Sequence, residues 1–170
     1  MIPIRLIGIG SPSGDDRIGW DVIEALVASG LLQRFPAGTV EACCCDRPGA
    51  LLALFREVEL AVVIDAMQSG APAGTVRRLG AEELAPGQGM VSCHGIGVAE
   101  QLALGRALGL LPPALLLYGI EAPHAAAAAE PAPEVRAAIP ELLRLLVSDL
   151  EDRLGAKPGL GAAAVGPGQP

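Results

Sequence analysis

The sequence predicts an α/β fold, a three-layer sandwich in which helices cover both faces of a twisted, mostly parallel five-stranded sheet. Short aliphatic runs alternate along the chain with longer segments of helical periodicity, a pattern typical of helix-covered sheets. Hydrophobic residues make up 51% of the chain and aromatic residues only 2%, so we expect a core of aliphatic side chains. The 170 residues suit one domain, which we assign to residues 1–154.

The apolar pattern and its breaks place the individual elements. Strands are expected over residues 4–9, 39–45, 60–64, 75–79 and 115–120, and helices over residues 18–28, 50–58, 98–108 and 134–154. The uninterrupted apolar run 60–64 suits a central parallel strand buried on both faces. A parallel crossover needs roughly a dozen residues, more than the chain has between 60–64 and 75–79. The strand at 75–79 is therefore expected to be the antiparallel one, and residues 80–90 to carry the chain back.

Two segments have no apolar periodicity. Residues 122–133 are rich in Ala and Pro and are expected to form a loop that can act as a flap. Residues 155–170 contain mainly Gly, Ala, Pro and Gln, and we expect a disordered tail because this composition cannot bury enough apolar surface.

Charge and composition argue against several kinds of partner and location. The net charge of −7 would repel nucleic acid, and no apolar stretch approaches the roughly 20 residues that span a bilayer. The first residues lack the pattern of a secretory signal, so we expect a cytoplasmic protein without a membrane or nucleic-acid partner. The consecutive cysteines 43–45 are expected to be reduced strand residues and not a disulfide framework, because adjacent strand residues point to opposite faces.

Acidic residues follow the expected strands at their carboxyl ends, where open α/β sheets bind ligands. The candidates at this edge are Asp15, Asp16, Asp46, Asp65, Glu121 and the loop histidine His94. Five carboxylates and an imidazole with few cationic neighbours repel one another unless a cation lies among them. The sequence therefore predicts a metal-seeking site formed by Asp16, Asp65 and His94.

Each candidate also has a structural interpretation. Asp16 can cap the first helix, Asp65 can belong to a turn, His94 can cap the following helix, and Asp46 can act as a cap before Pro48.

Other chemistry fits the motifs less well. Gly8 and Gly10 resemble part of a dinucleotide-binding motif, but Asp15 and Asp16 would place negative charge where a pyrophosphate should bind. Cys93 next to His94 suggests a thiol nucleophile, but successive side chains diverge in direction.

Four motifs together resemble the maturation endopeptidases of nickel-iron hydrogenases. They are Gly8-Ile9-Gly10-Ser11-Pro12-Ser13-Gly14-Asp15-Asp16-Arg17-Ile18-Gly19-Trp20, Val62-Val63-Ile64-Asp65-Ala66, Ser92-Cys93-His94-Gly95-Ile96-Gly97 and Leu117-Tyr118-Gly119-Ile120-Glu121. Their order and spacing cover most of residues 4–154.

The resemblance implies an endopeptidase that removes a C-terminal extension from a hydrogenase large-subunit precursor once nickel has been inserted. It implies metal-contacting roles for Asp16, Asp65 and His94, and a role in activity for Asp46. The nickel would arrive within the precursor, so the resting protein need hold no metal. The alternatives left open are whether Asp15 or Asp16 faces the metal, and whether the metal or a carboxylate such as Asp46 activates the hydrolysis.

Arg17 stands where the family usually has glycine, and we expect it to add a cation near the site. A non-catalytic nickel-binding maturation factor is the second hypothesis for the chain. A nucleotide or flavin module is the third, and the acidic first loop argues against it.

Overall fold

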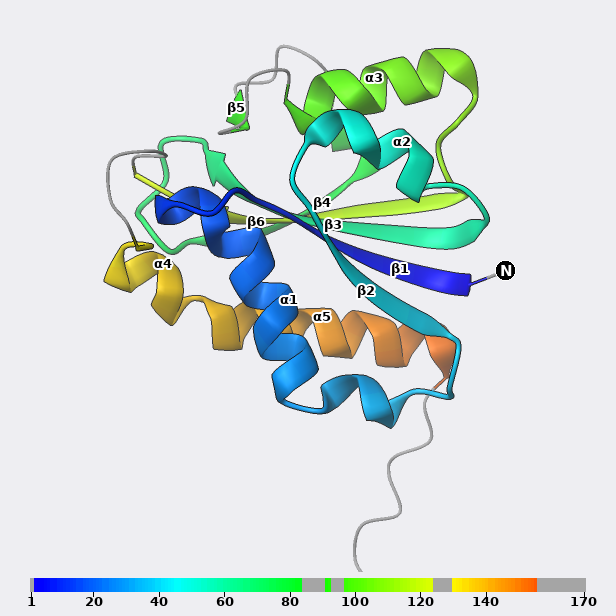
Figure 1. The fold of residues 1–170 in the computed structure, drawn as a ribbon, viewed down its shortest axis with the longest axis horizontal. Coiled ribbons are helices and arrows are strands. Elements are labelled where there is room, and N and C mark those ends of the chain that lie inside the picture. Colours follow the sequence, from blue (N-terminus) through cyan, green and yellow to red (C-terminus); the bar gives the residue numbers. More distant parts are fainter. Residues whose placement is uncertain (1, 84–90, 93–96, 124–129, 156–170) are drawn as a thin grey trace, which may run out of the picture.

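The computed structural model describes residues 2–83, 91–92, 97–123 and 130–155. Its centre is a mixed sheet with the strand order β2-β1-β3-β6-β4 (Figure 1). The strands are β1 (Ile2–Ile9), β2 (Val40–Cys45), β3 (Val58–Gln68), β4 (Val76–Gly80) and β6 (Ala114–Glu121). β1, β2, β3 and β6 are parallel, and β4 pairs antiparallel with β6. The expected mostly parallel sheet with one antiparallel strand is confirmed, and a two-residue strand, β5 (Val91–Ser92), adds an antiparallel pair at the end of β3.

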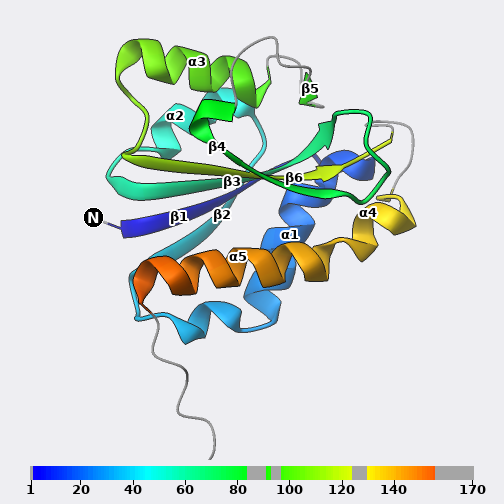
Figure 2. The same ribbon diagram turned by 180° about the vertical axis from the view of Figure 1, so that it is seen from behind.

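Helices cover both faces of the sheet, as Figures 1 and 2 show from opposite sides. The helices are α1 (Ile18–Ala28), α2 (Leu51–Leu54), α3 (Val98–Leu108), α4 (Pro133–Ala137) and α5 (Ile139–Leu154). α1, α4 and α5 lie on one face and α2 and α3 on the other. Each face has its own cluster of buried apolar side chains, so the three-layer arrangement is confirmed.

The expected helix over residues 50–58 is wrong at its end. The helical part consists of a 3-10 turn, η3 (Pro48–Ala50), and the four residues of α2, and Val58 already belongs to β3. Glu57 has a φ of 61°, a left-handed conformation that ends the helical turn and redirects the chain.

β3 is longer than the expected strand 60–64, and Asp65 therefore lies inside the strand, not after it. Asp65, Ala66 and Met67 pair with residues of β6, and Met67 and Gln68 pair with β5. These partners are distant in sequence, so the apolar run alone could not show how far the ladder continues.

The expected single helix over residues 134–154 is divided into α4 and α5. Pro140 lies at the start of α5, where the missing N–H of proline costs least, and Ala138 separates the two helices. Gly155 ends α5 with a φ of 60°. Residues 124–129 of the expected flap and 156–170 of the expected tail lie outside the described residues.

Three glycines allow α1 to start close above the sheet. A Cβ added at Gly8 would lie 2.2 Å from the carbonyl oxygen of Gly19, and one added at Gly10 would lie 2.9 Å from that of Asp16. A Cβ at Gly19 would lie 2.0 Å from the carbonyl oxygen of Ile9. Close helix–strand packing accounts for these glycines without a bound nucleotide.

Within the described parts of the chain, none of the helices is both long enough and apolar enough to cross a lipid bilayer.

Candidate functional site

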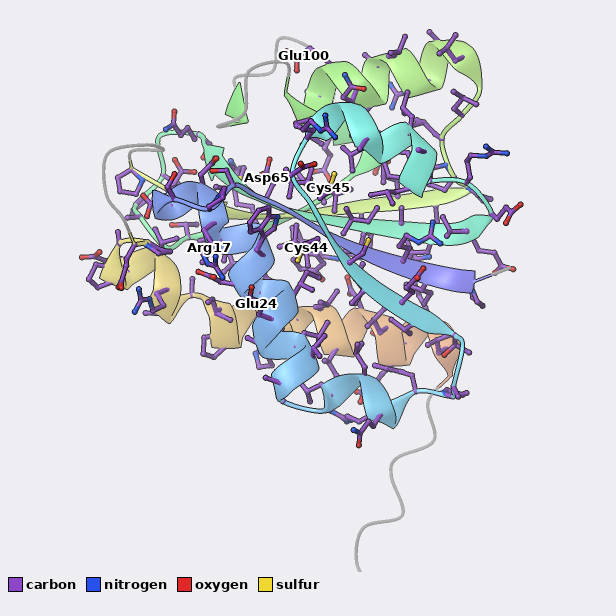
Figure 3. All side chains as sticks on the ribbon, viewed as in Figure 1. Arg17, Glu24, Cys44, Cys45, Asp65 and Glu100 are labelled. Atoms are coloured by element: carbon purple, nitrogen blue, oxygen red, sulfur yellow. The ribbon has the colours of Figure 1, made fainter. Side chains whose placement is uncertain are left out.

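The carboxyl ends of the four parallel strands lie at one edge of the sheet, together with most of the predicted site residues. Asp16 lies in a short 3-10 helix after β1, η1 (Gly14–Arg17), and Asp46 directly follows β2. Asp65 lies near the end of β3, and Glu121 is the last residue of β6. Figure 3 shows Asp65 and Cys45 at this edge and Arg17 and Glu24 on the α1 side.

Asp65 is a buried carboxylate, with 3% of its surface exposed. Strand alternation places it on the same face as Val63 and Met67, under α2 and α3. It pairs with Gly119 of β6, and a Cβ at Gly119 would lie 2.2 Å from the Sδ atom of Met67, so the missing side chain makes room for the thioether. Burial chiefly raises the pKa of the neighbouring Cys45 thiol, and the charges of Asp46 and Asp65 add to this increase.

Asp16 is half-buried, and its Oδ1 atom is shielded from solvent, as is Oδ1 of Asp65. The backbone oxygen of Asp16 accepts a hydrogen bond from the N–H of Ser11 at 3.2 Å, which closes the loop after β1. The N-cap of α1 is Arg17 and not Asp16, so the interpretation of Asp16 as the cap of this helix is wrong.

Asp15 has a structural contact that sequence reasoning missed. Its side chain is buried, and Oδ1 accepts a hydrogen bond from the backbone N–H of Ala132 at 2.7 Å. Ala132 is the N-cap residue of α4, so this bond joins the loop after β1 to the start of the C-terminal helices. The only feature of the sequence that pointed to this contact was the pair of adjacent acidic residues.

Glu121 has a similar supporting role. The backbone N–H groups of Ser69 and Gly70 donate to its Oε1 atom at 2.7 and 2.9 Å, and the Ser69 hydroxyl donates to Oε2 at 2.7 Å. These bonds fix the turn after β3. Backbone N–H groups therefore stabilise the carboxylates of both Glu121 and Asp15 in their buried positions.

Asp46 is exposed, unlike Asp65. It pairs with the adjacent Arg47 at 3.3 Å, and both side chains are mostly exposed to solvent, so the ion pair contributes little stability. The N-cap of η3 is Arg47, so the interpretation of Asp46 as a cap before Pro48 is wrong.

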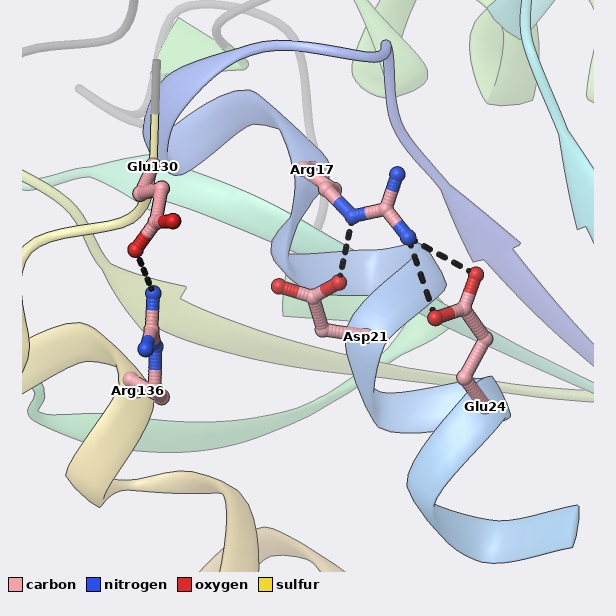
Figure 4. A network of polar contacts seen from close by, with 5 residues as sticks. All are labelled: Arg17, Asp21, Glu24, Glu130 and Arg136. Carbon is pink, nitrogen blue, oxygen red and sulfur yellow. Dashed lines mark hydrogen bonds and ion pairs between the residues drawn. The ribbon is translucent and has the colours of Figure 1, made fainter. Parts of the chain in front are cut away.

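Arg17 does not supply a free cation to the site. Its Nε atom donates to Asp21 at 2.7 Å, and its Nη2 atom donates to Glu24 at 2.9 and 3.0 Å (Figure 4). These contacts, led by the hydrogen bond to Asp21, raise the pKa of the guanidinium. The expected additional charge near Asp16 is therefore neutralised along α1.

His94 and Cys93 lie outside the described residues. β5 brings the chain alongside β3, where Ser92 pairs with Met67, two residues from Asp65. Among the described residues, no group of three or more His, Cys, Asp or Glu is placed to hold a metal ion. The set Asp16, Asp65 and His94 therefore stays a prediction.

The consecutive cysteines are strand residues, as expected. Cys45 is buried, Cys43 is half-buried and Cys44 is exposed, and all three are free thiols. Burial raises the pKa of each thiol, which favours the unreactive protonated form.

A known family of proteins matches most of this chain. A family model described as hydrogenase maturation protease matches residues 47–149. The chain belongs to the hydrogenase maturation protease family.

A curated relative agrees with this assignment. The chain is 34% identical over 125 residues to the hydrogenase expression/formation protein HupD of Thiocapsa roseopersicina, and the alignment covers 69% of this chain and 53% of HupD. The chain thus spans about half the length of this curated relative. The fold is similar to that of the hydrogenase maturating endopeptidase HybD from E. coli, with a TM-score of 0.70 and 24% identity over 89% of this chain and 94% of that one. A [NiFe] hydrogenase maturation protease HybD from Thermococcus kodakarensis has a TM-score of 0.67 and 22% identity over 92% of this chain and 100% of that one.

Proposed function

We propose that this chain is an endopeptidase that removes a C-terminal extension from the precursor of a nickel-iron hydrogenase large subunit. Membership of the maturation protease family supports this proposal. The structural observation that carries it is the placement of Asp16 and Asp65, because η1 contacts β3 and each residue has a carboxylate oxygen shielded from solvent. We expect this processing to take place in the cytoplasm.

The proposed site recognises nickel that the precursor already holds. Asp16, Asp65 and His94 would supply two carboxylates and one imidazole, a weak ligand set for a metal that is held mainly by thiolates of the substrate. The nickel is thus part of the substrate and not a resident cofactor. Hydrolysis follows either from polarisation of the scissile carbonyl by the metal or from activation of water by a carboxylate. The exposed carboxylate of Asp46 is accessible to water, as a general base must be.

The direct test is mass spectrometry of the precursor before and after incubation with the purified protein. We expect the nickel-loaded precursor to lose its extension and the nickel-free precursor to stay intact. Equal cleavage of both forms would contradict recognition of nickel. Binding of the loaded precursor without any cleavage would instead support a non-catalytic nickel-binding maturation factor.

Substitutions test the assignment of the site. Asp16→Ala, Asp65→Asn and His94→Ala should each abolish processing of the loaded precursor while circular dichroism shows a retained fold. Asp152→Ala is the matched control, since it removes an exposed carboxylate of α5 away from this edge. Wild-type activity in any of the three site variants would remove that residue from the site.

A further inference from the structure

A groove of about 410 Å³ lies between the loop after β1 and the start of the C-terminal helices. Pro12, Pro131 and Ile139 form the apolar part of its lining. The remaining lining residues form two ion pairs, Arg17 with Asp21 and Arg136 with Glu130. The function proposed above gives this groove no role.

The groove is continuous with the loop that carries Asp16. Pro12 and Arg17 lie on either side of Asp15 and Asp16 in the sequence, and both line the groove. The opposite wall contains Pro131, directly before Ala132, whose N–H donates to Asp15 at 2.7 Å. This hydrogen bond holds the two walls together beside the candidate site.

The charges of the lining fit a polypeptide chain better than an anion. Arg17 and Arg136 are hydrogen-bond donors that carboxylates already hold (Figure 4). Arg17 contacts Asp21 at 2.7 Å and Glu24 at 2.9 and 3.0 Å, and Arg136 contacts Glu130 at 2.8 Å. The two arginines are thus paired with three carboxylates, Asp21, Glu24 and Glu130, so a phosphate would meet more repulsion than attraction. An extended main chain presents both N–H and C=O groups, and its side chains can contact the apolar lining.

We propose that this groove binds an extended segment of the precursor polypeptide next to the bond that is cut. The inference rests on the proposed function and adds the surface that positions the substrate chain. Arg136 is the residue to test, because it lies on the wall opposite the Asp16 loop and its side chain is about half exposed.

The experiment is steady-state processing of the nickel-loaded precursor by the full-length protein. For Arg136→Ala we expect an increase of about tenfold in KM with an unchanged kcat, because the lost contact belongs to substrate binding. Arg136→Lys keeps the positive charge, so we expect it to raise KM less than Arg136→Ala does. Arg144→Ala is the matched control, since Arg144 is an exposed arginine of the same helical region that pairs with Glu141 at 2.8 Å outside this groove.

Five results would overturn the inference. A wild-type KM for Arg136→Ala shows that the substrate does not bind in the groove. A lower kcat with an unchanged KM shows that Arg136 acts in the chemical step or in folding, and not in substrate binding. Inhibition by inorganic phosphate that depends on Arg136 indicates an anion site. A dimer that disappears with Arg136→Ala indicates that the groove binds a second copy of the chain. If the wild-type protein cleaves no precursor at all, the proposed function fails, and the role of the groove fails with it because the precursor is then not its substrate.

Discussion

Asp15 and Asp16 are neighbours in sequence, but their carboxylates have different surroundings. The Asp15 carboxylate is buried against the N-cap of α4, where it accepts the N–H of Ala132. Asp16 lies in η1, which contacts β3, the strand of Asp65. We infer that Asp15 positions the loop, and Asp16 stays the proposed metal contact.

Two substitutions of Asp15 should distinguish the contribution of its hydrogen bond from that of its negative charge. Asp15→Asn keeps an oxygen that can accept the N–H of Ala132, so we expect nearly wild-type stability and processing. Asp15→Ala leaves that N–H without its partner and should lower the free energy of unfolding by about 1–3 kcal/mol. Urea denaturation and the processing assay measure both effects. If Asp15→Asn folds normally but fails to process the precursor, the negative charge of Asp15 is required and this role is wrong.

Tyr118 of β6 joins the sheet to α5 through a partly buried hydrogen bond of its hydroxyl. Its hydroxyl donates to Asp149 Oδ2 at 2.7 Å, and the Nε atom of Arg78 in β4 donates to the same oxygen at 2.5 Å. Burial raises the pKa of the Tyr118 phenol, and the hydrogen bond to Asp149 and its negative charge raise it further.

This pKa shift predicts a pH dependence of stability. The phenol ionises more easily in the unfolded chain, so its contribution is complete below about pH 10 and is lost as the pH rises toward the pKa of the folded state. At neutral pH, Tyr118→Phe should be less stable than the wild type by about 1 kcal/mol. The difference should shrink above about pH 10 in denaturation experiments. If the difference in the free energy of unfolding between Tyr118→Phe and the wild type stayed constant from about pH 7 to about pH 11, ionisation of the phenol would not be its cause.

Helix α1 depends on glycine at its contact with the sheet. A Cβ at Gly19 would lie 2.0 Å from the carbonyl oxygen of Ile9 and 2.6 Å from that of Ile64, and both atoms belong to the backbone of the sheet. The helix must therefore shift to accept any larger residue.

Gly19→Ala should lower the free energy of unfolding by about 3 kcal/mol or more, because backbone atoms cannot turn aside as a side chain can. Gly49→Ala is the control, since a Cβ there would meet no atom of the described residues within 4 Å. We expect its stability to lie within about 0.5 kcal/mol of the wild type. Equal stability of both variants in urea would show that α1 does not pack this closely.

The sequence located most elements because the pattern of apolar residues is local. The helices at 18–28 and 98–108 and the strand at 39–45 agree with α1, α3 and β2 within one residue. The errors arose where distant partners decide the end of an element. β3 continues past Asp65 because β5 and β6 pair with it, and α2 ends early because the chain turns into β3.

On the scale of the whole molecule, one sheet supports two apolar clusters. Leu51 of α2 belongs to the cluster on one face and Leu146 of α5 to the cluster on the other, and both side chains are fully buried. Because the same strands supply both clusters, the two faces should lose their structure together.

Leu51→Ala and Leu146→Ala should each lower stability by about 2–5 kcal/mol and keep a single unfolding transition. Far-UV circular dichroism follows the whole fold, and the fluorescence of Trp20, the only tryptophan of the chain, follows α1. The two signals should shift together in both variants. Separate transitions in Leu51→Ala would indicate that the layers unfold independently.

The sequence by itself determined the α/β class, the order of most elements and the edge of the sheet at which the acids gather, because these follow from local patterns and the direction of the strands. Only the tertiary structure decided how the acids are used. Asp15 finds its partner 117 residues away, and Glu121 finds Ser69 at a distance of 52 residues. A buried carboxylate must have donors, and chain folding decides which backbone groups supply them. Folding therefore gave Asp15 and Glu121 contacts that support the loops. Asp16 and Asp65 remain the proposed site residues because of their place at the carboxyl ends of the strands.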